Sequence, residues 1–177
     1  MTDSTHADPA TPPVKWSSII VSAYLPTLMS SLGYGAVIPL IPLTAVHIGA
    51  SAALAAAIAA LVGIGQIIGD VPAGWLVTKI GEKWSLVIAM LIDAVALVSM
   101  GLVHHLGLLA VAVFVNGMAG AVYGIARQNY LTVAIPYRYR ARALSTLGGV
   151  FRVGWFVGPM AGSWICLLYT SDAADDP

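Results

Sequence analysis

The sequence carries few charged residues. Only 9% of its 177 residues are Asp, Glu, Lys or Arg, against about 25% in an average soluble domain. Between Trp16 and Gly69 there is none of the four. Apolar residues make up 59% of the chain, which is more apolar surface than a soluble protein of this length can bury. We therefore predict a polytopic membrane protein.

Cysteine, net charge and catalytic motifs are also scarce. The single cysteine, Cys166, excludes an internal disulfide framework and a cysteine-rich metal cluster. A net charge of zero and a pI near 6.9 give no basic surface for nucleic acid. The chain contains no Gly-x-Ser-x-Gly, no His-Glu-x-x-His and no phosphate-binding Gly-x-x-x-x-Gly-Lys-Ser/Thr. The pair His104-His105 has no third ligand nearby in the sequence, so an exposed turn is favoured over a metal site. We expect no enzymatic activity, no catalytic residue, no metal and no organic cofactor.

The apolar segments have the length that a membrane requires. A hydrocarbon core about 30 Å thick is crossed by roughly 20 apolar helical residues. Turn-forming and charged residues divide the chain into five such segments. We predict an all-α fold with transmembrane helices over about 16–44, 52–77, 84–103, 108–131 and 143–168.

The two ends of the chain differ from these segments. Residues 1–15 are rich in proline and polar residues and are predicted to be a disordered cytoplasmic tail. A secretory signal is disfavoured because the leader is acidic and the next apolar segment is too long. Residues 169–177 are acidic, and we expect them to be non-native sequence or a truncated tail. The chain is accordingly interpreted as a fragment.

Basic residues alternate with the predicted helices. They precede the first helix, follow the second and follow the fourth, whereas the turns after the first and third contain no Lys or Arg. The residues concerned are Lys15, Lys79, Lys83, Arg138, Arg140 and Arg142. Because cytoplasmic loops of membrane proteins are enriched in Lys and Arg, we predict a cytoplasmic amino terminus, in the cytoplasmic membrane of a bacterium.

Two predicted helices carry a polar stripe. Polar residues recur at spacings of three and four, which places them on one helical face. A polar face of a membrane helix is expected to turn towards protein or water. The candidate cavity residues are Tyr24, Thr27, Ser31 and Tyr34 in the first helix, and Asn116, Tyr123 and Arg127 in the fourth. Hydrogen bonding between helices, without a cavity, is the alternative.

Four charged residues fall inside predicted helices: Asp70, Asp93, Arg127 and Arg152. An unpaired charge at mid-bilayer costs on the order of 3 kcal/mol. Similar predicted depths favour one pair between Asp70 and Arg127 and another between Arg152 and Asp93. Such pairs either hold helices together statically or include an acid that exchanges a proton during a conformational cycle.

The charged loop after the second helix resembles a loop motif of the major facilitator superfamily. The family pattern is Gly-x-x-x-Asp-basic-x-Gly-basic-basic, and the matching residues are Gly74, Lys79, Gly81 and Lys83. Thr78 stands where the family acid is usual, and Glu82 stands where a basic residue is usual. In the family that acid helps to lock the cytoplasmic side when the carrier faces outward. The resemblance implies a gating role here, with Asp70 as a substitute for the acid.

The fifth segment carries a second likeness. Gly154-Trp-Phe-Val-Gly158-Pro159-Met-Ala-Gly162 is similar to the Gly-x-x-x-Gly-Pro-x-x-Gly pattern of the family's proton-coupled antiporters. Independently of the family, glycines four residues apart form a smooth face for close helix contact, and Pro159 can bend the helix.

Two further segments bear on the same family. The segment Ile38-Pro39-Leu-Ile-Pro42 resembles the paired prolines at the end of the family's first helix. The fourth helix departs from the antiporter pattern Arg-x-x-Gln-Gly, because Val113 stands in place of the arginine. The role of that arginine is therefore not carried over to this chain.

The resemblance implies a fold of twelve helices in two six-helix halves, of which this chain holds the first five. The function it implies is secondary transport of a small organic solute by alternating access, as proton-coupled efflux of a drug or metabolite. A sugar or organic-acid symporter is the alternative within the fold. A non-transporting truncated fragment or a membrane-embedded enzyme is the alternative from another class. The implied partners are the solute, the lipid bilayer and the remaining helices of the carrier, with the proton as coupling ion and no nucleic acid.

Overall fold

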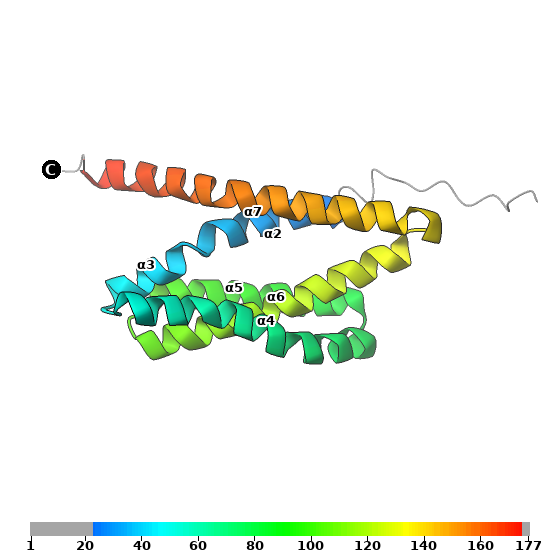
Figure 1. Ribbon diagram of the computed structural model, residues 1–177, viewed down its shortest axis with the longest axis horizontal. Coiled ribbons are helices and arrows are strands. Elements are labelled where there is room, and N and C mark those ends of the chain that lie inside the picture. The colour runs from blue at the N-terminus through cyan, green and yellow to red at the C-terminus, as the bar shows by residue number, and fades with distance from the viewer. Residues whose placement is uncertain (1–22, 175–177) are drawn as a thin grey trace, which may run out of the picture.

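The computed structural model describes the backbone of residues 23–174 and the side chains of residues 23–164. The predicted tail 1–15, residues 16–22 of the first predicted helix, the end of the 169–177 tail and the side chain of Cys166 lie outside the described residues. The rest is a bundle of helices that run up and down one common direction (Figure 1).

Every regular element between residues 23 and 174 is an α-helix, which confirms the predicted fold class. The helices are α2 (Leu25–Val37), α3 (Leu40–His47), α4 (Ala52–Ile80), α5 (Glu82–Leu102), α6 (Leu106–Ala134) and α7 (Tyr137–Ala174).

Four helical stretches in the described part are long and apolar enough to cross a membrane: Leu25–His47, α4, α5 and α6. The helices α4 and α6 have 29 residues each. At 1.5 Å per residue this is about 43 Å, longer than the roughly 30 Å hydrocarbon core. The chain is thus a multi-pass membrane protein.

The first predicted helix is interrupted. The sequence predicts an unbroken helix to residue 44, but α2 ends at Val37 and α3 begins at Leu40. Pro39 lies at the break, where it has no backbone N–H to donate and its ring restricts the preceding residue. The N–H of Ile38 still donates to the carbonyl of Tyr34 at 3.1 Å. The proline therefore divides the first span into two pieces.

The turns on either side of α4 are tight. Gly49 and Gly81 adopt φ values of +103° and +82°, which disfavour a residue with a Cβ atom. The Ser51 side chain accepts a hydrogen bond from the Leu54 N–H at 3.3 Å and caps the start of α4. These short connections make successive helices antiparallel.

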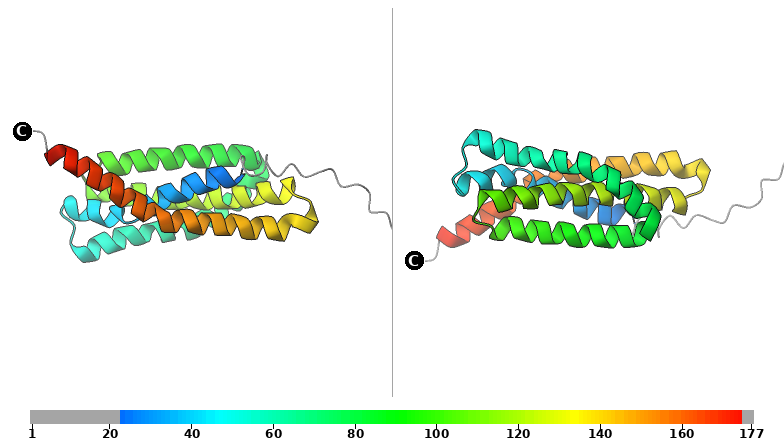
Figure 2. Two further views of the ribbon diagram at one scale, coloured as in Figure 1. Left: turned by 90° about the horizontal axis from the view of Figure 1, so that it is seen from above. Right: turned by 90° about the horizontal axis from the view of Figure 1, so that it is seen from below.

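The helices pack in two groups, with α2 and α7 above α4, α5 and α6 in Figure 1. Figure 2 shows α7 in front when the bundle is seen from above, and α4, α5 and α6 in front when it is seen from below. In one group α6 packs against both α4 and α5, and in the other α2 packs against α7. Glycines permit both close contacts. A Cβ built on Gly69 of α4 would lie 2.9 Å from the Met118 Cα of α6, and one on Gly158 of α7 would lie 2.5 Å from the Leu32 carbonyl oxygen of α2.

Two apolar clusters occupy opposite ends of the bundle. One joins α3, α4, α5 and α6 around Ile41, Ile58 and Leu109. The other joins the start of α7 to the end of α6 around Leu131 and Leu147. The α4–α5 and α6–α7 turns lie at the same end of the bundle (Figure 1). The basic residues predicted for these loops lie in the adjoining helices instead, Lys79 near the end of α4, Lys83 at the start of α5, and Arg138, Arg140 and Arg142 in the first turns of α7, which begins six residues earlier than predicted.

Candidate functional site

A cavity of about 250 Å³ that includes several polar side chains lies between α2 and α5, with α6 contributing one side chain. A smaller cavity of about 120 Å³ adjoins it and shares Ser30, Tyr34, Asp93 and Leu97. The full lining of the larger one is Pro26, Met29, Ser30, Tyr34, Ala89, Met90, Asp93, Ala94, Leu97 and Tyr123. The lining is mixed, with hydroxyl, carboxylate, thioether and aliphatic groups side by side.

The carboxylate of Asp93 joins three helices at mid-depth. The Tyr34 hydroxyl on α2 donates to Asp93 Oδ1 at 3.0 Å. The Asn116 amide Nδ2 on α6 donates to the same oxygen at 2.5 Å. Asn116 is only 2% exposed, so its amide is committed to this interaction, whereas Asp93 and Tyr34 also line the cavity. The acid is thereby fixed by donors from both neighbouring helices.

A second set of contacts surrounds Tyr123 on α6. The Ser30 hydroxyl donates to the Tyr123 hydroxyl oxygen at 3.3 Å. The Arg127 guanidinium lies over the rings of Tyr123 and Phe151, at 5.3 Å from each centroid. Its Nε and Nη1 atoms are buried and make no hydrogen bond to any described residue. Arg127 therefore keeps hydrogen-bonding capacity that this conformation does not use.

The polar stripe of the first helix is divided between two environments. Tyr34 faces the cavity, whereas Thr27 and Ser31 are fully buried. The Thr27 hydroxyl donates to the carbonyl of Ala23, just before α2, and the Ser31 hydroxyl donates to the carbonyl of Leu28 within α2. The Tyr24 hydroxyl donates to the Ala143 carbonyl of α7 at 3.3 Å. Tyr34 thus agrees with a cavity and Tyr24 with hydrogen bonding between helices, whereas Thr27 and Ser31 bond only to nearby carbonyls of their own segment.

Neither hypothesised ion pair forms among the described residues. Arg127 stacks on aromatic rings, and Asp70 is exposed on α4. Asp93 takes its hydrogen bonds from Tyr34 and Asn116, while Arg152 is exposed on α7. Similar depth along the bundle is necessary for such a pair, but it does not place two side chains on facing surfaces.

The residues of the predicted gating loop lie at the α4–α5 turn. Gly81 provides the turn itself through its positive φ. The Lys79 ammonium lies 4.8 Å from the centre of the Trp75 ring, and Lys83 is exposed. A Cβ built on Gly74 would meet no atom within 4 Å. In this conformation the loop makes no contact, among the described residues, that would lock it to another helix's acid.

The glycines of the antiporter-like segment face α2. Hypothetical Cβ atoms on Gly154 and Gly158 would collide with Ser31 and Leu32, and one on Gly162 would lie 3.1 Å from the Ala36 Cβ. Pro159 sits inside the continuous helix α7, with its Cδ near the Gly35 position. The segment therefore brings the α7 backbone close to α2.

Sequence reasoning missed the α2 side of the cavity around Ser30. Ser30 is adjacent to the predicted stripe and four residues before Tyr34, so the same helical-face argument with a wider stripe would have included it. The predicted cavity also lacked a wall from α5, because Asp93 is the one charged residue between Trp84 and Leu102 and no polar stripe marks that helix. Within the described side chains, no group of three His, Cys, Asp or Glu could hold a metal ion.

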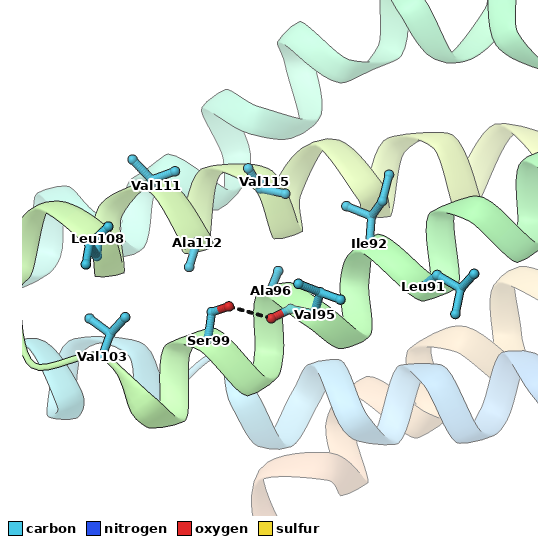
Figure 3. Close-up of a pocket in the computed structure, with 10 residues that line it drawn as sticks. All are labelled: Leu91, Ile92, Val95, Ala96, Ser99, Val103, Leu108, Val111, Ala112 and Val115. Carbon is cyan, nitrogen blue, oxygen red and sulfur yellow. Dashed lines mark hydrogen bonds between the residues drawn. The ribbon is translucent and has the colours of Figure 1, made fainter.

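A larger cavity, about 600 Å³, lies away from the Asp93 site. It is an apolar groove between α5 and α6 (Figure 3), lined by nine apolar residues and Ser99. Its chemistry differs from that of the Asp93 cavity, which holds the polar groups.

An antiparallel bundle of membrane-length helices, three of which are joined by hydrogen bonds at Asp93, defines a helical multi-pass membrane protein. The chain belongs to the Major Facilitator Superfamily, whose family model matches residues 23–173. This confirms the resemblance that the motifs indicate. The family is one of transporters.

Two curated relatives are "Uncharacterized MFS-type transporter" proteins from Mycobacterium tuberculosis strains CDC 1551 / Oshkosh and ATCC 25618 / H37Rv. Each is 24% identical over 157 residues, which is 89% of this chain and 23% of the relative. A third is the class H tetracycline resistance protein of Pasteurella multocida, 29% identical over 153 residues, which is 81% of this chain and 36% of the relative. The chain thus spans about a quarter to a third of the length of these relatives.

Proposed function

We propose that this chain forms part of a secondary carrier that exports a small organic solute by alternating access, in exchange for protons. The observation that carries the proposal is the Asp93 carboxylate. It lies at mid-depth, lines a cavity, and is held by donors from two different helices. Membership of a transporter family and the similarity to a tetracycline resistance protein support the same interpretation.

The arrangement around Asp93 provides a coupling device. A carboxylate at mid-bilayer is costly unless donors satisfy it. Here Tyr34 and Asn116 satisfy it from α2 and α6. A movement of α2 relative to α6 would remove one donor, and binding a proton would then offset the loss. Conversely, proton release favours the conformation in which both donors are in place.

The cavity favours an amphipathic, uncharged or weakly charged solute. Tyr34, Tyr123 and Ser30 offer hydroxyls, while Met29 and Met90 offer adaptable apolar surface. A volume of about 250 Å³ is below the roughly 300–1,000 Å³ of ordinary ligand pockets. We infer that further helices of the carrier complete the site, as expected for a fold of two halves.

Transport of an organic acid is the second candidate, and Arg127 favours it. Its buried Nε and Nη1 atoms have no hydrogen-bond partner in the described part of the chain. A guanidinium binds carboxylates in bidentate fashion. An anionic solute reaching the face of α6 beside Tyr123 would satisfy it.

Gating and orientation complete the proposal. The amino terminus and the α4–α5 and α6–α7 turns lie in the cytoplasm, as the basic residues predict. The turn containing Lys79, Gly81 and Lys83, together with Gly74 and Asp70, takes part in closing the cytoplasmic side. Its partner groups belong to other conformations or to the remaining helices.

The test is transport by everted bacterial membrane vesicles containing the chain together with the remaining helices of its carrier. With an imposed pH gradient, we expect accumulation of tetracycline or of amphipathic dyes. Asp93→Asn keeps the acceptor oxygen but loses the titratable group, so it should abolish gradient-driven accumulation while preserving solute binding. Asp8→Asn, the same acid-to-amide change in the predicted amino-terminal tail, is the matched control and should transport normally. Undiminished transport by the Asp93→Asn variant would contradict the proposed coupling.

A further inference from the structure

The outer surface of α5 and α6 carries a continuous apolar groove. Its larger part, about 600 Å³, runs from Leu91 to Val103 on α5 and from Leu108 to Val115 on α6 (Figure 3). The one polar lining residue, Ser99, donates its hydroxyl to the Val95 carbonyl of its own helix at 2.7 Å. The groove thus offers no free polar group to an occupant.

A second part of the groove continues towards the α4–α5 turn. It has a volume of about 250 Å³ and shares Ile92 and Val115 with the first part. Its remaining lining comes from Ile88, Ala89, Met118, Ala119 and Val122 and, on α4, from Pro72, Trp75 and Leu76. Together the two parts follow α5 along most of its length.

A basic residue stands at the end of this groove. Pro72, Trp75 and Leu76 are followed at helical spacing by Lys79, so all four share one face of α4. The Lys79 ammonium lies 4.8 Å from the Trp75 ring, and the ring is 60% exposed. Lys79 is therefore an exposed cation directly beyond the apolar lining that α4 contributes to the groove.

The other charges near this end leave a positive balance. Lys83 is exposed on the next turn, next to Trp84, which is 63% exposed. Glu82 is half-buried in the first turn of α5. Asp70 precedes Lys79 by nine residues, about two and a half helical turns, and so lies on the opposite side of α4.

We propose that this groove is a binding site for one anionic phospholipid, with an acyl chain along α5 and α6 and the headgroup phosphate at Lys79. Charge complementarity argues for this occupant, because a cation stands at one end of a groove that is otherwise apolar. Exposed tryptophans at the same level are typical of the membrane–water interface. Anionic lipids attract such lysines in the cytoplasmic leaflet, where the predicted orientation places this turn.

The experiment uses quenching of tryptophan fluorescence by brominated lipids. Trp75 is kept as the single tryptophan by replacing Trp16, Trp84, Trp155 and Trp164 with phenylalanine. The chain is reconstituted in phosphatidylcholine vesicles with increasing fractions of dibrominated phosphatidylglycerol or dibrominated phosphatidylcholine. We expect phosphatidylglycerol to reach half-maximal quenching at an about fivefold lower mole fraction, the preference that one interfacial lysine provides.

Lys79→Gln should remove that preference, whereas Arg142→Gln, an equal charge change at the exposed start of α7, should retain it. Native mass spectrometry of the chain with all tryptophans, and of its Lys79→Gln variant, gives the same comparison as the number of phosphatidylglycerol molecules retained. Equal quenching by both lipids would mean only general contact with the bilayer. The same would follow if Lys79→Gln and Arg142→Gln reduced the preference for phosphatidylglycerol equally. If neither brominated lipid quenched Trp75 fluorescence, protein would cover the groove. Any of these results overturns the proposal.

Discussion

The substitution Gly158→Ala should separate α2 from α7. A Cβ atom at residue 158 would lie 2.5 Å from the Leu32 carbonyl oxygen, 2.8 Å from the Gly35 Cα and 2.9 Å from the Ala36 nitrogen. All three are backbone atoms, so no side-chain rotation relieves the collision. The helices must move apart by about 1 Å to restore ordinary contact. Overpacking of this kind costs about 1–3 kcal/mol.

The matched control is Gly149→Ala on the same helix. A Cβ at Gly149 meets no atom within 4 Å, so this variant should be unchanged or should gain up to about 1 kcal/mol from helix propensity. Unfolding of the chain in detergent by increasing SDS, followed by circular dichroism, gives both free energies. If the two alanine variants are equally stable, the close backbone approach at Gly158 is not what holds α7 to α2.

Three other outcomes follow from the described contacts. Gly81→Ala should cost about 1–3 kcal/mol in the same unfolding assay, because Gly81 has φ +82° and ψ 164°, a region that residues with a Cβ avoid; Gly74→Ala, in open space, is its control. Tyr34→Phe and Asn116→Ala should be coupled by about 0.5–3 kcal/mol in a double-mutant cycle, since both donate to one carboxylate oxygen; strict additivity would mean that the Asp93 network does not act as a unit. In a Cys166→Ser background, the cysteine of a His105→Cys variant should react with an impermeant maleimide added to intact cells, whereas that of a Lys83→Cys variant should not. The reverse pattern would mean that the predicted orientation is inverted.

The architecture was predictable because its signal is spread over many residues. Long uncharged segments, turn residues and alternating basic loops each indicate the same helix order, and a membrane leaves few alternatives to helices. The break at Pro39 was less predictable, since proline is tolerated within some membrane helices, including at Pro159 of α7. Which proline interrupts its helix depends on the neighbouring helices, and these are not encoded locally.

The sequence predicted several of the residues at the site, but not the contacts between them. The spacing of polar residues correctly grouped Tyr34 with a helical face, but it could not say which neighbour each member meets. Asp93 and Arg152 have similar predicted depth, yet Asp93 is hydrogen-bonded by Tyr34 and Asn116 while Arg152 is exposed on α7. Pairing depends on the rotation of each helix about its axis, which packing of glycines such as Gly158 and Gly69 determines.

The interruption at Pro39 has a consequence for movement. The piece before it, α2, is held along α7, whereas the piece after it, α3, is held by α4 and the apolar cluster around Ile41 and Leu109. One membrane crossing is therefore anchored to two different partners. If the α2–α7 pair shifted against the other helices, the crossing would bend at Ile38 and Pro39, and α3 could stay with α4 while α2 followed α7.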